Sequence, residues 1–500
     1  MNHSRSERIP VSDNNASRNS SSTAPPGSPG ATTAPPVGSL LKALLIRLHF
    51  YIGLFIGPFI LFAALSGSLY ALSPHLEQWL YHDQLYTPQR GPAQPLAEQI
   101  AVAQRVIGDD AQLSAVRPAP EPGMTTRVMY SAPTLGPSES RAIFVDPVTL
   151  EVRGDLVVYG TSGALPLRSW IDHLHRSLLL GDLGRHYSEL AASWLWVAAL
   201  AGLAIWWFGP RRARRQAARN AAVKASPSQR RARLRWRHST LGLCLLIGML
   251  FFSATGLTWS QWAGGNIGVL RAAWGWSTPS VSTQLDPSAK SDMSGHQHHA
   301  MASMDTQPHV SFALADFDAV LAAARAAGLD AGRIEIQPAT SASAAWKVKE
   351  IDRRWPTQVD EVAIDVRDMG VVDRVRFAEY PLAAKLTRWG IDAHMGVLFG
   401  LPNQLVLVTF AVGICVMVIW GYMMWWRRRP RFPTTAGSDG TLSAIAARLP
   451  VSVNLGILLV ALALGLALPV MGVSLAAFLL IDVIRGKHAA RRANAAVKGA

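Results

Sequence analysis

Cysteine is scarce in this chain, and several common enzyme motifs are missing from it. Only two of its 500 residues are cysteine, Cys244 and Cys415, and both fall inside apolar runs, which excludes a disulfide framework. No GxGxxG loop follows an expected strand, and neither a phosphate-binding loop nor a paired nucleophile and base is evident. We therefore expect no built-in flavin or nicotinamide domain, so any electron donor must be a separate molecule.

Acidic residues are absent from one strongly basic stretch. Residues 209–237 read GPRRARRQAARNAAVKASPSQRRARLRWR and hold ten arginines, one lysine and no carboxylate. The formal net charge of +15 would fit a nucleic-acid partner, but the basic residues flank apolar runs, as the positive-inside rule describes. We therefore expect these charges to face membrane lipid and expect no nucleic-acid partner.

Long apolar runs are abundant. Four of them reach the roughly 20 residues that a helix needs to cross a bilayer: Leu44–Leu72, Leu190–Phe208, Thr240–Trp262 and Gln404–Trp426. A fifth, Val451–Ile484, is interrupted by Pro469 and predicts a hairpin of two short helices. Segments 73–189 and 263–403 carry both signs of charge, so we expect six crossings, with these segments outside and both termini in the cytoplasm.

The outer segments predict two small α/β domains. Leu96–Ile107 and Leu314–Ala327 have helical apolar spacing, whereas four stretches alternate like antiparallel strands: Thr126–Ser131, Ala142–Val145, Ala344–Val348 and Glu361–Val366. The predicted fold class is thus an α-helical membrane bundle of four core spans and a C-terminal hairpin, with two α/β domains outside. The expected division is a disordered cytoplasmic tail 1–39, span 1 at 40–72, outer domain 1 at 73–170, an outer-histidine helix with span 2 at 171–208, a basic cytoplasmic loop 209–237, span 3 at 238–262, outer domain 2 at 263–390, an outer-histidine helix with span 4 at 391–426, a cytoplasmic linker 427–450, the hairpin 451–485 and a basic tail 486–500.

Histidines and glycines recur at two fixed offsets in the numbering, which predicts an internal duplication. RLHFYIGLFIGPFILFAALSGSLYAL contains His49 and Gly53, and RHSTLGLCLLIGMLFFSATGLTWS contains their counterparts His238 and Gly242, at a first offset of 189 (238 − 49). Before the second and fourth spans, IDHLHRSLLLGDLGR and IDAHMGVLFGLPNQ contain His175 and His394, at a second offset of 219 (394 − 175). The chain therefore repeats one unit: a span with an inner histidine, an outer domain, an outer histidine and a second span.

These four histidines predict two haem sites. An ionisable side chain inside a span is costly and is a functional candidate by default, although a histidine near a helix end can also be interfacial. Gly53 and Gly242 lie one turn after His49 and His238 on the same helix face and leave room for a flat group such as haem, for which neutral imidazole is a common axial ligand. We expect His49 with His238 to form an inner bis-histidine site and His175 with His394 an outer one. His173 and His186 are the alternative ligands.

A histidine- and methionine-rich tract interrupts the second outer segment. SDMSGHQHHAMASMDTQPH, residues 291–309, offers six candidate ligands for a soft or borderline metal such as copper: His296, His298, His299, Met301, Met304 and His309. The alternative is a flexible polar linker whose histidines are incidental.

With these residues in view, the chain resembles the PepSY-associated transmembrane family of bacterial membrane proteins. The likeness covers roughly residues 40–430 and rests on RLHFYIGLFIG, LHRSLLLGDLGR, RHSTLGL and HMGVLFGLPNQ. It implies PepSY-like periplasmic domains and a bacterial inner-membrane location. Some members are similar to ferric-siderophore reductases with two b-type haems, which agrees with the two histidine pairs; the tract and the C-terminal hairpin lie outside the common pattern.

The leading functional prediction is a transmembrane di-haem b oxidoreductase. It would take electrons from a quinol or a separate flavoprotein and reduce a periplasmic metal or metal chelate, such as a ferric siderophore or copper; no catalytic residue is predicted. Two alternatives remain from the sequence: a PepSY-domain protein that restrains a peptidase or senses a metal, and a metal transporter.

Overall fold

The protein is described here by a computed structural model that covers residues 35–108, 111–209, 227–285, 312–427 and 441–498. The expected N-terminal tail up to residue 34, residues 210–226 of the basic loop and residues 428–440 of the cytoplasmic linker lie outside the described residues. The His/Met-rich tract at 291–309, with its six candidate metal ligands, also lies outside them.

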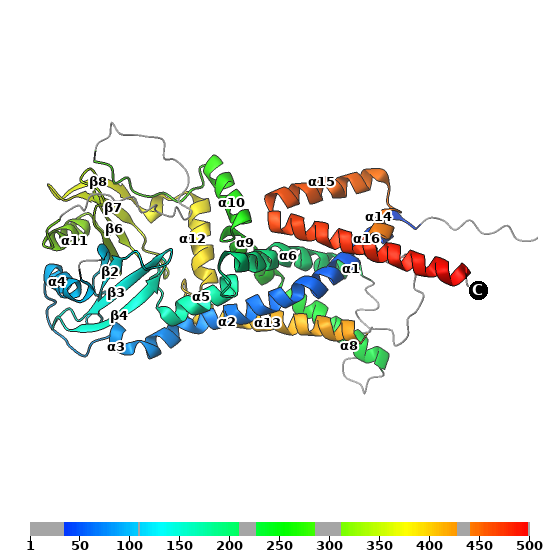
Figure 1. Cartoon of the computed structure of the whole chain (residues 1–500), viewed down its shortest axis with the longest axis horizontal. Helices are drawn as coiled ribbons and strands as arrows, with labels where there is room; N and C mark the ends of the chain where they lie inside the picture. Colours follow the sequence, from blue (N-terminus) through cyan, green and yellow to red (C-terminus); the bar gives the residue numbers. More distant parts are fainter. Residues whose placement is uncertain (1–34, 109–110, 210–226, 286–311, 428–440, 499–500) are drawn as a thin grey trace, which may run out of the picture.

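The described chain is mostly helical, and its long apolar helices form a bundle (Figure 1). Four helical stretches are long and apolar enough to cross a membrane, and a bent pair adds a fifth: Val37–Leu80, Gly181–Trp207, Leu401–Trp426 and Pro469–Ala489, with Gln229–Cys244 and Leu246–Thr258 bent by 58°. Apart from the C-terminal stretch, these regions consist of α1 (Val37–Tyr51), a π-helical turn (Ile52–Ile56), α2 (Gly57–Leu80), α6 (Gly181–Trp207), α8 (Pro227–Cys244), α9 (Leu246–Thr258) and α13 (Leu401–Trp426). The four predicted core spans therefore coincide with such helices, although the third is bent, and one arm of the hairpin is also long enough. The other arm, Val451–Ala467, is shorter, so the structure supports four or five of the six expected crossings.

Short helices connect this bundle to the outer part of the molecule. They are α3 (His82–Leu85), α5 (Pro166–Ser177), α10 (Trp262–Ala273), a 3-10 turn (Phe377–Glu379) and α12 (Leu382–His394). α5 ends at Ser177 and is followed by Leu178, which adopts a left-handed conformation with φ 53°; α6 begins shortly afterwards at Gly181. This break turns the chain sharply, so that α5 packs on both α2 and α6.

The two outer segments form one eight-stranded antiparallel sheet, which corrects the prediction of two separate α/β domains. Its strand order is β4-β3-β2-β1-β5-β6-β7-β8. The strands are β1 (Gln112–Arg117), β2 (Thr126–Ser131), β3 (Glu139–Val145), β4 (Val152–Tyr159), β5 (Ile334–Gln337), β6 (Trp346–Glu350), β7 (Glu361–Asp365) and β8 (Gly370–Val375). Each segment thus gives four strands in the same outward order, and the segments meet where β1 pairs with β5 at Val116 and Ile336.

A shared hydrophobic core explains why the two halves merge. Helices α4 (Leu96–Ile107) and α11 (Asp316–Ala326) cover the same face of the sheet, and their apolar residues belong to one cluster with those of the central strands. Ile100 of α4, Phe317 of α11 and Val116 of β1 are all fully buried in it. A four-stranded half on its own would expose the edge of β1 or β5, and pairing removes both edges.

The C-terminal region forms the expected helical hairpin, although one arm is longer than predicted. α14 (Leu442–Ala446) precedes α15 (Val451–Ala467) and α16 (Pro469–Lys498), which pack against each other after the break at Leu468. Gly465 and Gly472 meet at this hairpin, since a Cβ on Gly472 would lie 2.8 Å from Gly465 Cα. α16 packs on α6, where Trp194 Nε1 donates to Ser474 Oγ at 2.8 Å.

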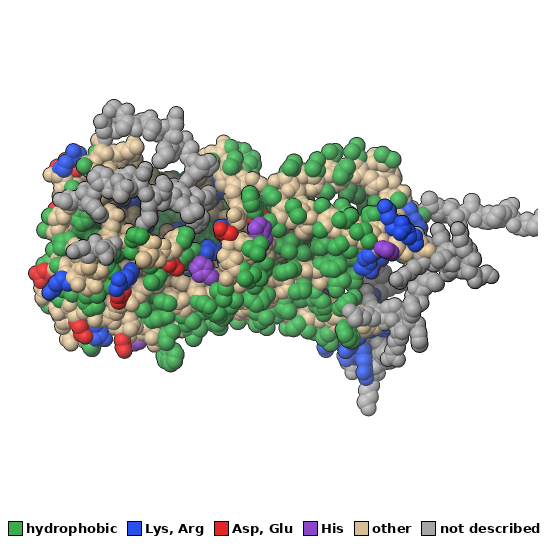
Figure 2. All heavy atoms as spheres, in the orientation of Figure 1, with side chains coloured by type: hydrophobic (Ala, Val, Ile, Leu, Met, Phe, Trp, Pro, Cys, Tyr) green, Lys and Arg blue, Asp and Glu red, His purple; other side chains and the backbone are tan. Residues whose placement is uncertain are grey.

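The molecule has three layers along its long axis. The sheet lies at one end, the bundle follows, and the ends of α8 and α16 lie at the opposite end (Figure 1). Figure 2 shows a broad apolar belt over the bundle, with Lys and Arg side chains gathered at the end away from the sheet. Exposed Arg231, Arg235 and Arg237 of α8 and exposed Arg485 and Lys487 of α16 belong to this basic end. The protein is therefore a multi-pass membrane protein with charge concentrated beyond one end of its apolar belt.

Candidate functional site

The inner histidines lie together near the basic end of the bundle. His49 projects from α1 and His238 from α8, and both side chains are half-buried. Their ring centroids are 6.3 Å apart and the ring planes are inclined by 78°. The predicted inner pair is thus brought together from two helices that are far apart in the sequence.

Each inner histidine is held by a backbone carbonyl on a neighbouring span. His49 Nδ1 lies 3.0 Å from Ala198 O on α6, and His238 Nδ1 lies 3.0 Å from Met417 O on α13. A carbonyl oxygen only accepts, so Nδ1 carries the proton and donates in both cases. The lone pair of each ring is therefore on Nε2, the arrangement found in metal-binding histidines whose orientation is fixed by a second hydrogen bond.

Glycines on the same neighbouring spans lie close to these rings. A Cβ at Gly202 would lie 3.2 Å from His49 Cε1, and one at Gly421 would lie 3.9 Å from His238 Cε1. Sequence reasoning did not find this second pair of glycines. A signal was present, because Gly202 and Gly421 are related by the second offset (421 − 202), which also relates His175 to His394.

The glycines predicted from sequence have a less defined environment. Gly53 is exposed, and a Cβ there would meet nothing within 4 Å, whereas a Cβ at Gly242 would lie 3.3 Å from Met417 Sδ. Gly53 therefore lies at the surface, and Gly242 faces the side chain of Met417, the residue whose carbonyl accepts from His238. Their role in binding a cofactor stays a prediction.

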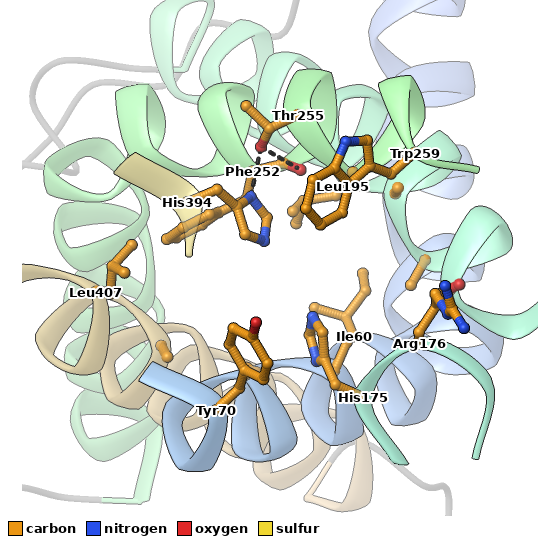
Figure 3. Close-up of a pocket in the computed structure, with 18 of the residues that line it drawn as sticks. Ile60, Tyr70, His175, Arg176, Leu195, Phe252, Thr255, Trp259, His394 and Leu407 are labelled. Carbon is orange, nitrogen blue, oxygen red and sulfur yellow. Dashed lines mark hydrogen bonds between the residues drawn. The ribbon is translucent and has the colours of Figure 1, made fainter. Parts of the chain in front are cut away.

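The outer histidines line a cavity between the bundle helices and the short connecting helices. His175 of α5 and His394 of α12 extend into it from opposite sides (Figure 3). It encloses about 1280 Å³ not filled by protein atoms, including its opening. The remaining lining is largely apolar, with Ile60, Leu195, Phe252, Leu407 and Ile414 among its side chains.

Hydroxyl groups on the first and third spans hold the outer histidines. His175 Nδ1 is 3.0 Å from Ser66 Oγ, and His394 Nδ1 is 2.5 Å from Thr255 Oγ1. Each hydroxyl donates its own proton to a backbone carbonyl of its helix, Ser66 to Phe62 at 2.8 Å and Thr255 to Phe251 at 2.8 Å. Each hydroxyl must therefore accept from the imidazole, which again leaves the lone pair on Nε2.

The hydroxyls were also missed from the sequence, although their spacing was visible. Ser66 and Thr255 are related by the first offset (255 − 66), and each is followed by a glycine, in SGSLY and TGLTW. A Cβ at Gly67 would lie only 3.1 Å from His175 Cε1, which explains why that position has no side chain. All four histidines thus have partners that recur at the two offsets of the chain.

Burial keeps the outer imidazoles neutral, which is the form that binds a metal. α5 and α12 lie outside the membrane-spanning helices. Burial lowers the pKa of His175, although Asp172 and a backbone carbonyl partly oppose this effect. Burial, with a smaller contribution from nearby His175, lowers the pKa of His394 to about 3. Both rings are therefore uncharged at neutral pH.

The alternative histidines have other surroundings. The ring of His173 packs on Tyr159 with centroids 4.8 Å apart. His186 Nδ1 lies 3.1 Å from Leu183 O, and its Nε2 lies 3.4 Å from the indole nitrogen of Trp262. Neither residue lines the outer cavity. Within the described ranges, no three His, Cys, Asp or Glu side chains come together as a metal site.

Comparison with known proteins identifies the family of the chain. The curated proteins contain no match to it. A model of the PepSY-associated TM region matches residues 46–428, which include all four histidines and both outer segments. This match covers most of the 500 residues. The chain therefore belongs to the PepSY-associated TM region family.

Proposed function

We propose that this protein carries electrons across a membrane through two b-type haems and reduces a metal or metal chelate on the side of the outer sheet. The observation that carries the proposal is the common state of four histidines: each is held through Nδ1 by a fixed acceptor, and each keeps the Nε2 lone pair for a metal. Packing of a histidine in a protein core does not require the same Nδ1 hydrogen bond and the same free Nε2 in two matched pairs.

The geometry of the residues fits the proposed cofactor. A single ion held by two imidazole nitrogens at about 2 Å each places the two ring centres roughly 6 Å apart. The ring centroids of His49 and His238 are 6.3 Å apart. At the outer site, the largely apolar walls beside His175 and His394 suit a flat apolar ring that is held through two imidazoles.

The two sites lie at different depths. Seventeen residues separate His49 from Ser66 (66 − 49), which corresponds to about 25 Å of helix and approaches the roughly 30 Å of the hydrocarbon layer. The same number separates His238 from Thr255 (255 − 238), where the 58° bend brings the ends closer together. Haem held by two imidazoles supplies an iron that gains and loses one electron, and the chain holds one such site near each surface.

The charge distribution gives the proposed direction of transfer. The basic end of the bundle would face the cytoplasm by the positive-inside rule, and the sheet would face the periplasm of a bacterium. A quinol or a separate flavoprotein would then supply electrons at His49 and His238. Each electron leaving through the outer site would convert one acceptor ion, such as Fe(III) in a chelate, to Fe(II).

Histidine substitution tests this proposal by haem content. We expect two haems per chain in the purified wild-type protein, and one in each of the His238→Ala and His394→Ala variants, because each loses one axial ligand. The double variant should retain none. The matched controls are His173→Ala and His186→Ala, which remove histidines outside the two pairs and should keep both haems. Full haem content in His238→Ala and His394→Ala, or none in the wild type, would contradict the proposal.

A further inference from the structure

The outer cavity is lined by residues that recur at the two offsets of the chain. Gly67 with Gly256, and Tyr70 with Trp259, are related by the first offset, and both members of each pair line it. Three more lining pairs are related by the second offset: His175 with His394, Ala192 with Ala411, and Leu195 with Ile414. In these five pairs the two halves of the cavity have similar chemistry.

Three other lining pairs differ in polarity. Also at the second offset, Asp172 pairs with Ile391, Arg176 with Met395, and Ser188 with Leu407. All three polar members come from α5 and α6, and all three apolar members come from α12, its C-terminal end and α13. In Figure 3, Arg176 and Leu407 lie at opposite sides of the cavity, with Trp259 on the side of Arg176. The cavity therefore has one polar edge, at α5 and α6, and one apolar edge, at α12 and α13.

Arg176 is incompletely paired at the polar edge. Its Nη2 donates to Tyr159 OH at 2.7 Å, and its Nε lies 4.0 Å from the Asp172 carboxylate, which is too far for a hydrogen bond. The Nε atom is buried and has no hydrogen-bond partner among the described residues. Other arginines of the chain share this feature, but Arg176 is the arginine that lines the cavity. Buried donors usually have an acceptor, so its Nε can serve an oxygen ligand that enters the cavity.

Other polar groups near the cavity are already engaged. Ser188 Oγ donates to Arg185 O at 3.0 Å, and Ser260 Oγ donates to Leu257 O at 2.8 Å. On the other side, Arg353 donates to Asp392 at 2.6 Å, and Arg388 Nε forms an ion pair with the same carboxylate at 3.0 Å without a hydrogen bond. Neither of these two arginines lines the cavity. Arg176 is thus the lining cation with a donor still available for a guest.

We propose that Arg176 binds a carboxylate of the planar guest and so fixes its orientation in the outer cavity. The guest's anionic edge would face α5 and α6, and its apolar edge would face Leu407 and Met395. This inference rests on the proposed function, because it takes the guest to be a tetrapyrrole with acidic side chains. It adds a specificity that the histidines do not provide, since they hold the metal but not the rim of the ring.

Haem and its dimethyl ester distinguish this role from a structural one. The ester keeps the iron and the ring but lacks the carboxylates. We would produce the full chain without haem, in the His238→Ala background that leaves only the outer pair, and titrate it with both compounds. Arg176→Met, which introduces the residue found at position 395, should weaken haem binding about ten- to hundredfold and leave ester binding unchanged. Arg176→Lys should recover part of the loss.

Arg185→Met is the matched control. Arg185 lies in the first turns of α6, outside the cavity lining, and pairs weakly with exposed Asp182 at 3.8 Å. It should bind both compounds like its parent. Equal weakening of haem and ester in Arg176→Met, or no weakening of either, would overturn the inference while leaving the two-haem proposal intact. A parent chain that binds neither compound would instead refute the proposed function.

Discussion

At the scale of single residues, the arrangement depends on the groups behind the histidines. At the inner pair the partner is a carbonyl oxygen, which can only accept a hydrogen bond. At the outer pair it is a hydroxyl that already donates its proton to a backbone carbonyl. Both kinds of partner place the imidazole proton on Nδ1. The same chemistry recurs in all four cases, although the acceptors come from four different spans. The histidines are consequently presented in one tautomer, and no rearrangement is needed before a metal binds.

The glycines that face the rings give a prediction for each site separately. Gly67→Val should displace His175, since even a Cβ there lies 3.1 Å from the ring, and should remove the outer haem while keeping the inner one. Gly202→Val should do the reverse through His49, which would lie 3.2 Å from its Cβ. Gly456→Val in α15 is the control, because nothing lies within 4 Å of its Cβ position. Haem content and potentiometric titration report the outcome, and loss of the same haem in both variants would contradict it.

The residues that sequence reasoning found and missed differ in a simple physical way. The four histidines were found because each is costly in or near a span and has a counterpart at a fixed offset. Ala198 and Met417 could not be found, because a backbone carbonyl carries no residue signature. Ser66, Thr255, Gly202 and Gly421 were accessible through the same offsets, but serine and glycine are common in packed membrane helices and do not attract notice singly.

At the scale of elements, the joint between β1 and β5 holds the outer sheet together. One register pair, Val116 with Ile336, connects the halves, and a buried ion cluster lies beside it. Glu335 of β5 accepts from Arg117 Nε at 2.6 Å and lies 2.8 Å from Lys349 Nζ. All three side chains are largely buried, and Glu335 is only 3% exposed. Ions buried this well are costly to leave unpaired.

Glu335 should therefore make the joint sensitive to acid. Burial would raise its pKa, but Arg117 and Lys349 outweigh burial and hold the pKa below its ordinary value. A lowered pKa contributes stability above about pH 4.3, the unfolded value, and that contribution is lost as the pH falls through the folded value. At neutral pH, Glu335→Gln should destabilise the joint by about 3–5 kcal/mol, since Arg117 and Lys349 lose their counter-charge.

Hydrogen exchange of β1 and β5 in the full chain measures this effect. At pH 7, Glu335→Gln should exchange faster than the wild type in both strands, and the difference should shrink below about pH 4 as the wild type becomes protonated. Asp365→Asn is a suitable control, because this carboxylate pairs with Arg367, whose side chain is 67% exposed. A difference that is absent at pH 7, or that grows on acidification, would contradict the assignment.

Elements with a strong period were predictable, and those defined by pairing were not. Leu96–Ile107 is α4 with both ends correct, because its apolar face is continuous and proline precedes it. Four of the strands were expected, but β1, β4, β5 and β8 were missed. β4 and β8 are outer strands with few buried residues, and β5 is very short. The joining of two segments into one sheet depends on which edges meet in space, which no local pattern encodes.

At the scale of the whole molecule, the distribution of charged and apolar surface matches the three layers: the sheet, the helical bundle, and the ends of α8 and α16. The apolar belt separates a mixed-charge sheet from a basic end, as expected from the charge pattern of the sequence. The C-terminal hairpin, beyond residue 428 where the family match ends, adds to this belt and is attached to the core through buried Asp482. Asp482 accepts from Tyr51 OH at 2.8 Å, close in sequence to the inner histidine of α1. The inner pair lies near the basic end of the bundle and the outer pair lies where the connecting helices meet it, so an electron must pass between them in the proposed reaction.

Electron transfer across a sealed vesicle tests that central claim most directly. The purified, haem-loaded chain would be reconstituted with an impermeant low-potential reductant inside and a ferric chelate with a chromogenic Fe(II) ligand outside. We predict that wild-type vesicles form Fe(II) outside, and that His238→Ala and His394→Ala each abolish this reaction, because both sites must be occupied in series. Wild-type vesicles that produce no more Fe(II) than protein-free ones, or variants that keep the wild-type rate, would contradict the account.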